Sequence, residues 1–339
     1  MLVSACIVER LDDLKLDKSV NVNGQQILAE LERQRKLSEM KMWTKLPDVG
    51  TERNDVGVAV GDGKLFAVGG HDNDDKGYDL KSGEYLDLKT VDEGWKNLPD
   101  MGTIRCYLGV AFGDGKLFAV GGCGGSGHLK SGEYLDLKKV DEGWKRLPDM
   151  NIKRDDLGMA VGNGKLFAVG GHEGDNYHKS GEYLDLKKVD EGWKKLPDMG
   201  SKRSFLGVAV GDGKLFAVGG LDGDIGARPT LKSAEYLDLK EMSAGWKYLP
   251  DMNIRRNHFG VAVGDGKLFS VGGWDDSSSS KSREYLDLKK VDAGWKELPD
   301  MNLKRDELGV AVGDGKLFAV GGWDGYNSFK SGEYLRIAM

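Results

Sequence analysis

The sequence predicts an all-β protein that repeats one four-stranded sheet six times. Glycine accounts for 51 of the 339 residues, about twice the average frequency of ~7%, which indicates many tight turns. A segment close to Leu-Phe-Ala-Val-Gly-Gly recurs six times, and its first glycine is Gly69, Gly121, Gly170, Gly219, Gly272 and Gly321. A repeat of about 50 residues that holds several short strands is typical of one blade of a β-propeller.

The first complete repeat shows how four strands follow from the residues. Val56–Val60 and Lys64–Val68 are apolar runs too short for helices, and the Gly-Asp-Gly between them is a strong hairpin signal. Glu84–Leu88 supplies a third strand, and Trp95–Leu98 a fourth strand that Pro99 ends. We name these strands a to d. The continuous apolar runs of a and b indicate sheets covered on both faces, as in blades stacked around an axis.

The order of the strands predicts how the ring closes. The repeats begin with a d strand at Met42–Leu46 and end with a c strand at Glu333–Ile337. We therefore expect the N-terminal strand to complete the sixth blade, which removes an open sheet edge. The expected architecture is a six-bladed propeller over residues 43–339, preceded by an extension of residues 1–42. Within the extension, Gly24–Met42 has the composition and the partial apolar stripe of a short helix.

The repeats resemble those of the kelch family. Each contains the glycine doublet, a tyrosine within Glu-Tyr-Leu, a tryptophan in strand d and an arginine before strand a, and this pattern covers residues 43–339. The resemblance implies a propeller with strand a innermost and strand d outermost. Many kelch proteins carry a BTB domain ahead of the propeller, and we do not expect one within 42 residues.

Composition excludes several classes of function. The net charge is −6 and no run of five or six like charges occurs, so we do not expect nucleic acid as a partner. No N-terminal apolar stretch reaches the roughly 18–20 residues of a membrane span, and we expect no membrane association. Cys6, Cys106 and Cys123 are odd in number and widely spaced. This spacing fits neither a disulfide framework nor a CxxC zinc site and favours the cytoplasm, a reducing compartment.

The residues indicate neither catalysis nor a cofactor, and we expect a protein that is not an enzyme. The Gly-Asp-Gly-Lys turns lack the helix that a phosphate-binding loop needs. His71, Cys123 and His172 follow the glycine doublet in three successive blades. Strands ~4.8 Å apart place these positions about 10 Å from the axis and about as far from one another. Because zinc–ligand bonds are ~2.0–2.3 Å, we expect these three residues not to share a metal ion.

The repeats differ from one another mainly in two of their four connections. The a–b turns and c–d connections barely change, whereas the b–c and d–a connections vary strongly. Antiparallel strands place both variable connections at the same end of each blade, so the variation is concentrated on one face of the disc. In the kelch family this face commonly binds the partner.

The candidate partner-binding residues lie on this variable face. An arginine recurs ten residues after each blade tryptophan, and its regularity favours a structural role: Arg53, Arg105, Arg154, Arg203, Arg256 and Arg305. The two residues after each arginine differ and are expected to point toward the channel mouth: Asn54 and Asp55, Cys106 and Tyr107, Asp155 and Asp156, Ser204 and Phe205, Asn257 and His258, Asp306 and Glu307. The b–c loops of blades five and six add Trp274, Trp323, Tyr326 and Phe329. Acidic and basic residues nearly balance on this face, which leaves the charge of the partner open.

These observations favour a monomeric, non-catalytic binding module or scaffold that recognises a protein or peptide on the variable face. Two alternatives stay open. One is a small-molecule enzyme of the sialate-mutarotase kind, which is also a six-bladed kelch fold and needs an acid and a base that converge at the channel mouth. The other is an actin or cytoskeletal scaffold that makes its contacts through the outer rim.

Overall fold

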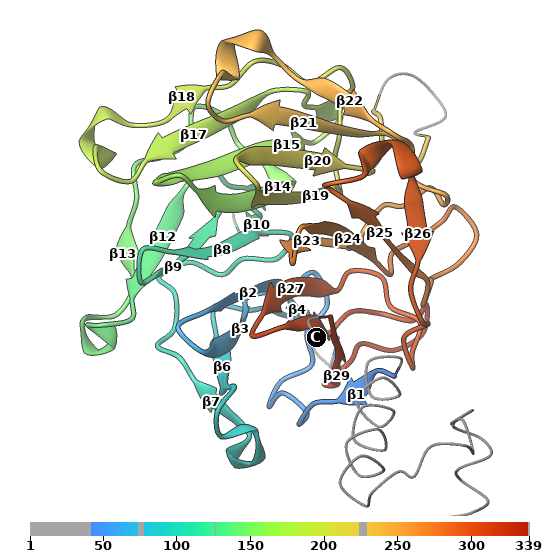
Figure 1. Cartoon of the computed structure of the whole chain (residues 1–339). Coiled ribbons are helices and arrows are strands. Elements are labelled where there is room, and N and C mark those ends of the chain that lie inside the picture. Colours follow the sequence, from blue (N-terminus) through green and yellow to red (C-terminus); the bar gives the residue numbers. More distant parts are fainter. Residues whose placement is uncertain (1–41, 74–77, 126, 224–228, 338–339) are drawn as a thin grey trace, which may run out of the picture. The chain divides into compact units, whose positions relative to one another are not determined.

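The computed structural model describes residues 42–73, 78–125, 127–223 and 229–337. The helix expected within residues 24–42 lies outside these residues, apart from Met42 itself. Residues from Met42 onward form one compact unit. In this unit, six antiparallel sheets stand around a central axis as the blades of a propeller (Figure 1). The six-bladed β-propeller predicted from the sequence is confirmed.

The blades share one strand order, which runs from the innermost strand outward. Blade one is β2 (Gly57–Gly61), β3 (Lys64–Val68), β6 (Gly83–Asp87) and β7 (Trp95–Asn97). Blade two is β8 (Gly109–Gly113), β9 (Lys116–Val120), β12 (Gly132–Asp136) and β13 (Lys145–Arg146). Blade three is β14 (Asp155–Gly162), β15 (Lys165–Glu173), β17 (Gly181–Asp185) and β18 (Lys194–Lys195).

Blades four to six repeat this arrangement. Blade four is β19 (Gly207–Gly211), β20 (Lys214–Val218), β21 (Ala234–Asp238) and β22 (Lys247–Leu249). Blade five is β23 (Gly260–Gly264), β24 (Lys267–Val271), β25 (Arg283–Asp287) and β26 (Trp295–Glu297). Blade six is β27 (Gly309–Gly313), β28 (Lys316–Val320), β29 (Gly332–Arg336) and the N-terminal strand β1 (Thr44–Lys45).

Shorter elements lie in the connections. The b–c connections of blades one to three contain the short strands β4 (His71–Asp72), β5 (Tyr78–Asp79), β10 (Cys123–Gly124), β11 (Gly127–His128) and β16 (Asn176–Tyr177). The c–d connections contain one 3-10 turn each, at η1 (Val91–Glu93), η2 (Val140–Glu142), η3 (Val189–Glu191), η4 (Met242–Ala244) and η5 (Val291–Ala293). These turns were not predicted from the sequence.

The a–b turns have the geometry that the Asp-Gly signal predicts. In blade one, Gly61 pairs with Lys64, which leaves Asp62 and Gly63 as the two turn residues. Their φ angles are 48° and 69°. A type I′ turn needs positive φ at both central residues, and aspartate followed by glycine accepts this conformation more readily than most residue pairs.

Strand β1 closes the ring as predicted. Thr44 pairs with Tyr334 and Lys45 with Glu333 in an antiparallel ladder with β29. The Leu46 N–H adds a hydrogen bond of 2.8 Å to the Gly332 carbonyl. The strand is shorter than the expected Met42–Leu46, and blade six is nevertheless complete because its outer strand comes from the other end of the propeller sequence.

A tryptophan at the first residue of each outer strand, or directly before it, bonds each blade to its neighbour. The Trp95 indole N–H donates to the Pro47 carbonyl at 2.9 Å, and the same bond joins every pair of adjacent blades. The equivalent donors and acceptors are Trp144 and Pro99, Trp193 and Pro148, Trp246 and Pro197, Trp295 and Pro250, and Trp43 and Pro299. An indole N–H is therefore hydrogen-bonded at all six interfaces, which stabilises the ring.

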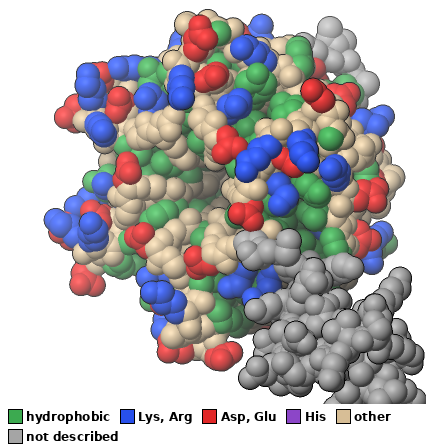
Figure 2. All heavy atoms as spheres, viewed as in Figure 1, with side chains coloured by type: hydrophobic (Ala, Val, Ile, Leu, Met, Phe, Trp, Pro, Cys, Tyr) green, Lys and Arg blue, Asp and Glu red, His purple; other side chains and the backbone are tan. Residues whose placement is uncertain are grey.

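The hydrophobic core lies between the blades and around the axis. Trp95 packs against residues of blade six and blade one, while Leu98 of the same segment packs into the cluster between blades one and two. The inner strands contact one another around the axis, and Figure 2 shows a hollow at the centre of the disc. The approach is close: a Cβ on Gly57 would lie 2.1 Å from the Val110 side chain of the next blade, so only glycine fits.

Candidate functional site

The variable face is built on an extension of strands a and b. In each blade, the residue directly after the repeated arginine pairs with the residue directly after the glycine doublet. These pairs are Asn54 and His71, Cys106 and Cys123, Asp155 and His172, Ser204 and Leu221, Asn257 and Trp274, and Asp306 and Trp323. This pairing brings the d–a and b–c connections together on one face, as expected from the sequence.

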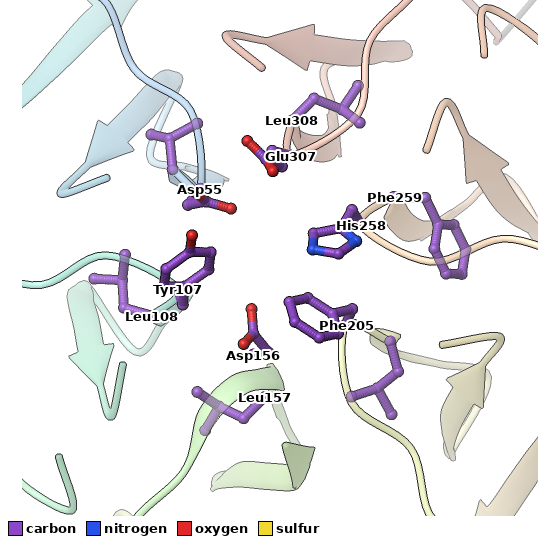
Figure 3. Close-up of a pocket in the computed structure, with 12 residues that line it drawn as sticks. Asp55, Tyr107, Leu108, Asp156, Leu157, Phe205, His258, Phe259, Glu307 and Leu308 are labelled. Carbon is purple, nitrogen blue, oxygen red and sulfur yellow. The ribbon is translucent and has the colours of Figure 1, made fainter. Parts of the chain in front are cut away.

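The second residue after each arginine points to the propeller axis. Asp55, Tyr107, Asp156, Phe205, His258 and Glu307 converge on a common centre in Figure 3. We call these six residues the axial ring. All six have φ angles between 50° and 55°, a conformation that non-glycine residues rarely adopt and that costs of order 1–3 kcal/mol each.

Hydrogen bonds between adjacent blades hold the axial ring in this conformation. In five of the six positions, the backbone N–H donates to the carbonyl of the ring residue in the preceding blade. These bonds run from Asp156 to Tyr107, Phe205 to Asp156, His258 to Phe205, Glu307 to His258 and Asp55 to Glu307, at 2.8–3.2 Å. The unusual backbone conformation therefore satisfies main-chain donors and turns every side chain inward.

The axial ring encloses a small cavity of about 110 Å³. Its wall carries three carboxylates, from Asp55, Asp156 and Glu307, together with Tyr107, Phe205 and His258. The rings of Phe205 and His258 pack together with centroids 3.8 Å apart. Among the described residues, no lysine or arginine forms an ion pair with the three carboxylates. The cavity is therefore acidic, with aromatic surface on the side of blades four and five.

Burial shifts the ionisation of these groups. Desolvation, together with repulsion from neighbouring carboxylates, raises the pKa of Asp55 and of Asp156 well above the ordinary value. Burial also raises the pKa of Glu307, although the Asn54 amide donates a hydrogen bond of 2.9 Å to its carboxylate. Burial lowers the pKa of His258 to about 4, so this imidazole is neutral at pH 7. A cation in the cavity would favour the ionised carboxylates.

A larger pocket of about 400 Å³ adjoins the axial cavity on blades five and six. Trp274 and Trp323 line it with Asp276 and Asp306, and His258 and Glu307 line both the pocket and the axial cavity. Burial beside Glu307 raises the pKa of Asp306 to about 7. The structure thus brings the two predicted loop tryptophans together with predicted axial residues. Tyr326 does not line this pocket and is 85% exposed.

The sequence matches the kelch motif six times, over residues 52–102, 104–151, 153–200, 202–253, 255–302 and 304–336. The chain belongs to the kelch-repeat family. No curated protein gives a significant match to the chain. Kelch propellers commonly serve as protein-interaction modules, and this is the general class of function that the family indicates. Among its described residues, this kelch propeller contains no helix long and apolar enough to cross a membrane.

The six repeated arginines of this kelch propeller do not form a basic ring on the surface. Their exposed fractions are 0–1%. In blade four, the Arg203 guanidinium donates to the Gly219 carbonyl, to the carbonyl and hydroxyl of Ser233, and to the Glu235 carboxylate at 2.8 Å. Equivalent pairs are Arg53 and Glu84, Arg105 and Glu133, Arg154 and Glu182, Arg256 and Glu284, and Arg305 and Glu333. Buried and neutralised inside the blades, these arginines are structural, as their regular spacing favoured, and their inclusion among the candidate binding residues was wrong.

The structure also assembles metal-ligating side chains that were not combined in the sequence-based prediction. Ligand atoms of Cys123, His128 and Asp155 lie within 4.8 Å of one another, as do those of Asp155, Asp156 and His172. His71 belongs to neither cluster and instead pairs with Asp79 at 3.0 Å. Only positions after the glycine doublets were compared from the sequence, so His128 was missed. The sequence feature that could have identified His128 is the short b–c connection of blade two, because a short hairpin there places His128 directly opposite Cys123.

Proposed function

We propose that this chain is a non-catalytic interaction module that holds a protein or peptide segment on the variable face. The observation that carries the proposal is where the repeats differ. Strands a to c and the turns at the opposite end are nearly identical in all blades, whereas the axial ring holds six residues of five kinds. Residues that only maintain a blade have no reason to differ between blades, so this divergence favours recognition of an asymmetric ligand.

The charge of the site supports a partner segment with a basic side chain. The repeated arginines are neutralised inside the blades, which leaves the carboxyl groups of Asp55, Asp156 and Glu307 as the acidic groups that line the axial cavity. A lysine or arginine side chain entering this cavity would relieve repulsion among the three carboxylates. It would also gain cation–π contact with aromatic rings of the wall.

The tryptophan pocket supports an apolar or aromatic anchor beside the basic one. Trp274 and Trp323 come from adjacent blades and share the 400 Å³ pocket with Asp276 and Asp306. Residues that dominate binding energy are enriched in tryptophan and cluster at the centre of an interface. We therefore propose a short segment that places a basic residue in the axial cavity and an apolar residue against the tryptophans.

A peptide selection tests this proposal directly. A phage-displayed library of random linear peptides is selected on the full chain, and enriched sequences are measured by calorimetry. We expect enrichment of lysine or arginine next to an apolar residue. Trp274→Ala and Trp323→Ala should each weaken binding by about 2 kcal/mol, or roughly 30-fold. The control is Tyr248→Ala, which removes a tyrosine that is 66% exposed on the outer strand of blade four and should leave affinity unchanged. Peptides that lose affinity only in the Tyr248 variant would place the binding site on the rim.

A small-molecule enzyme is the second candidate function, and one observation favours it. The pKa of Asp306 lies near 7, within the range suited to general acid–base chemistry, and the residue lines a pocket next to Glu307 and His258. A thermal-shift screen with sugars tests this candidate. Stabilisation by a sugar that is lost in Asp306→Asn would favour an enzyme over a peptide-binding module.

A further inference from the structure

Blades two and three place four potential metal ligands in two neighbouring cross-strand pairs. Cys123 of β10 lies directly opposite His128 of β11. Asp155 of β14 lies directly opposite His172 of β15. Directly opposed residues on antiparallel strands project on the same side of the sheet. The two pairs meet where the Asp155 carboxylate reaches His128, with 2.7 Å between Asp155 Oδ2 and His128 Nδ1.

One oxygen of the Asp155 carboxylate is buried without a hydrogen bond from the described residues. Asp155 is 4% exposed, and its Oδ1 atom has no hydrogen-bond partner among the described residues. His172 Nδ1 is 3.4 Å from this oxygen and is instead 2.9 Å from the Ser204 hydroxyl. An unsatisfied buried carboxylate oxygen is costly. A cation bound beside it would remove that cost.

We propose that Cys123, His128 and Asp155 bind one zinc ion, with the fourth coordination position open to water. The ligand atoms of the three residues already lie within 4.8 Å of one another. Zinc bonds of 2.0–2.3 Å in a tetrahedral arrangement need ligand atoms about 3.3–3.8 Å apart. Side-chain shifts of about 1 Å are therefore sufficient, and Cys123 and His128, the two ligands that would have to move, are both only partly buried.

The donor set selects zinc over the common hard cations. Thiolate and imidazole ligands suit zinc and similar transition metals, whereas calcium and magnesium prefer oxygen ligands. The charges also balance, because the Cys123 thiolate and the Asp155 carboxylate together neutralise Zn²⁺. Binding releases the thiol proton to solvent.

Binding has a distinctive consequence at His128. In the structure, His128 Nε2 accepts a hydrogen bond of 3.2 Å from the Gly174 N–H, while Nδ1 is 2.7 Å from Asp155 Oδ2. Coordination through Nδ1 moves the imidazole proton to Nε2, which then no longer accepts. The Gly174 N–H, on an exposed residue, would turn to water. The amide resonance of Gly174 therefore reports on the site independently of zinc analysis.

The experiment uses the full chain, stripped with a chelator and kept reduced with a phosphine. Zinc affinity is measured by competition with a chromophoric chelator, and stoichiometry by elemental analysis. Cobalt(II) substitution reports thiolate ligation through its sulfur-to-metal charge-transfer band. Cys123→Ser and His128→Gln remove ligands. Cys106→Ser and His71→Gln are matched controls. Cys106 is the cysteine that pairs with Cys123 across the strands, and His71 is a histidine at the position of blade one that is equivalent to Cys123. Melting curves confirm that each variant is folded.

We expect one zinc per chain, an affinity at least about tenfold weaker in each ligand variant, and unchanged affinity in both controls. The cobalt band should be absent in Cys123→Ser, and zinc should shift the Gly174 amide in the unsubstituted protein. The proposal is overturned if no stoichiometric zinc binds, if both ligand variants bind zinc as tightly as the parent, or if only magnesium or calcium binds. Because blades five and six carry the proposed peptide pocket, failure of the zinc site would leave the peptide proposal standing.

Discussion

Removing the closing strand is the most direct test of how this propeller holds together. Two truncations differ by only eight residues: one lacks residues 1–38 and the other lacks residues 1–46. The first retains β1 with Trp43 and Leu46, and the second removes all three. We expect the shorter truncation to unfold at the same temperature as the full chain and the longer one to be strongly destabilised.

The expected magnitude follows from the contacts that the longer truncation removes. Trp43 is 5% exposed and Leu46 3% exposed, and losing a buried tryptophan or leucine costs about 3–5 and 2–5 kcal/mol respectively. The Trp43 indole bond to the Pro299 carbonyl and the Leu46 bond to Gly332 add about 1 kcal/mol each. The sum, roughly 7–12 kcal/mol, is similar to the whole stability of a typical domain, about 5–15 kcal/mol.

Calorimetry and urea titration of both truncations provide the measurement. The single variant Trp43→Ala removes one contact and leaves β1 in place, so it should retain a cooperative transition about 10 °C lower. Equal melting temperatures for the two truncations would refute the reasoning, because blade six would then be stable without its outer strand.

Three further predictions concern the framework and the variable face. Arg203→Leu leaves the Glu235 carboxylate buried without its partner and should lower the free energy of unfolding by about 3–5 kcal/mol in a urea titration. Trp295→Ala should cost about 3–5 kcal/mol of folding energy because Trp295 is 6% exposed and bonded to its neighbour blade, whereas Trp274→Ala should leave stability nearly unchanged. Asp306 has a pKa near 7 in the folded protein and an ordinary pKa of ~3.9 in the unfolded chain. The folded state therefore binds the Asp306 proton more tightly. The stability that this proton contributes is fully present below pH 4 and is lost as the pH rises through 7. Between pH 4 and pH 8 the parent protein should therefore lose up to about 4 kcal/mol more stability than Asp306→Asn, and parallel curves for the two proteins would contradict the assigned shift.

Most of the architecture could be predicted because recurring residues mark where each repeat begins and ends. The glycine doublets, the Asp-Gly turns and the tryptophans recur at one spacing, and the phase of the first and last repeats implied that β1 would pair with β29. The 3-10 turns after strand c were not predicted, since Val91–Glu93 and its equivalents carry no strong helix signal over three residues. The helix expected within residues 24–42 stays a prediction, because it lies outside the described residues.

The sequence predicted on which face the candidate site lies, but it did not predict which of its side chains carry its charge. Alignment of the repeats placed both residues after each arginine at the channel mouth, but it could not show that the second one, Asp55 and its five equivalents, lines the axial cavity. The regular spacing of Arg203 and its equivalents favoured a structural role, but it could not identify Glu235 as the partner of Arg203, because the two residues are 32 positions apart in the sequence. It also could not pair His128 with Asp155, because that contact joins β11 in the b–c connection of blade two to the start of β14 in blade three. Such contacts depend on loop conformation, which no periodicity encodes.

In the axial ring, the residues that maintain the fold are distinct from the side chains that line the cavity. The backbone conformation of the ring is held by main-chain hydrogen bonds, and the blades are joined through tryptophan, proline and glycine positions common to the repeats. Exchanging one axial side chain therefore alters one sector of the cavity wall and leaves every blade interface intact. The cavity wall can thus be changed one blade at a time, and each substitution can be selected independently of the others. A near-symmetric scaffold can in this way acquire a site for a ligand that has no symmetry of its own.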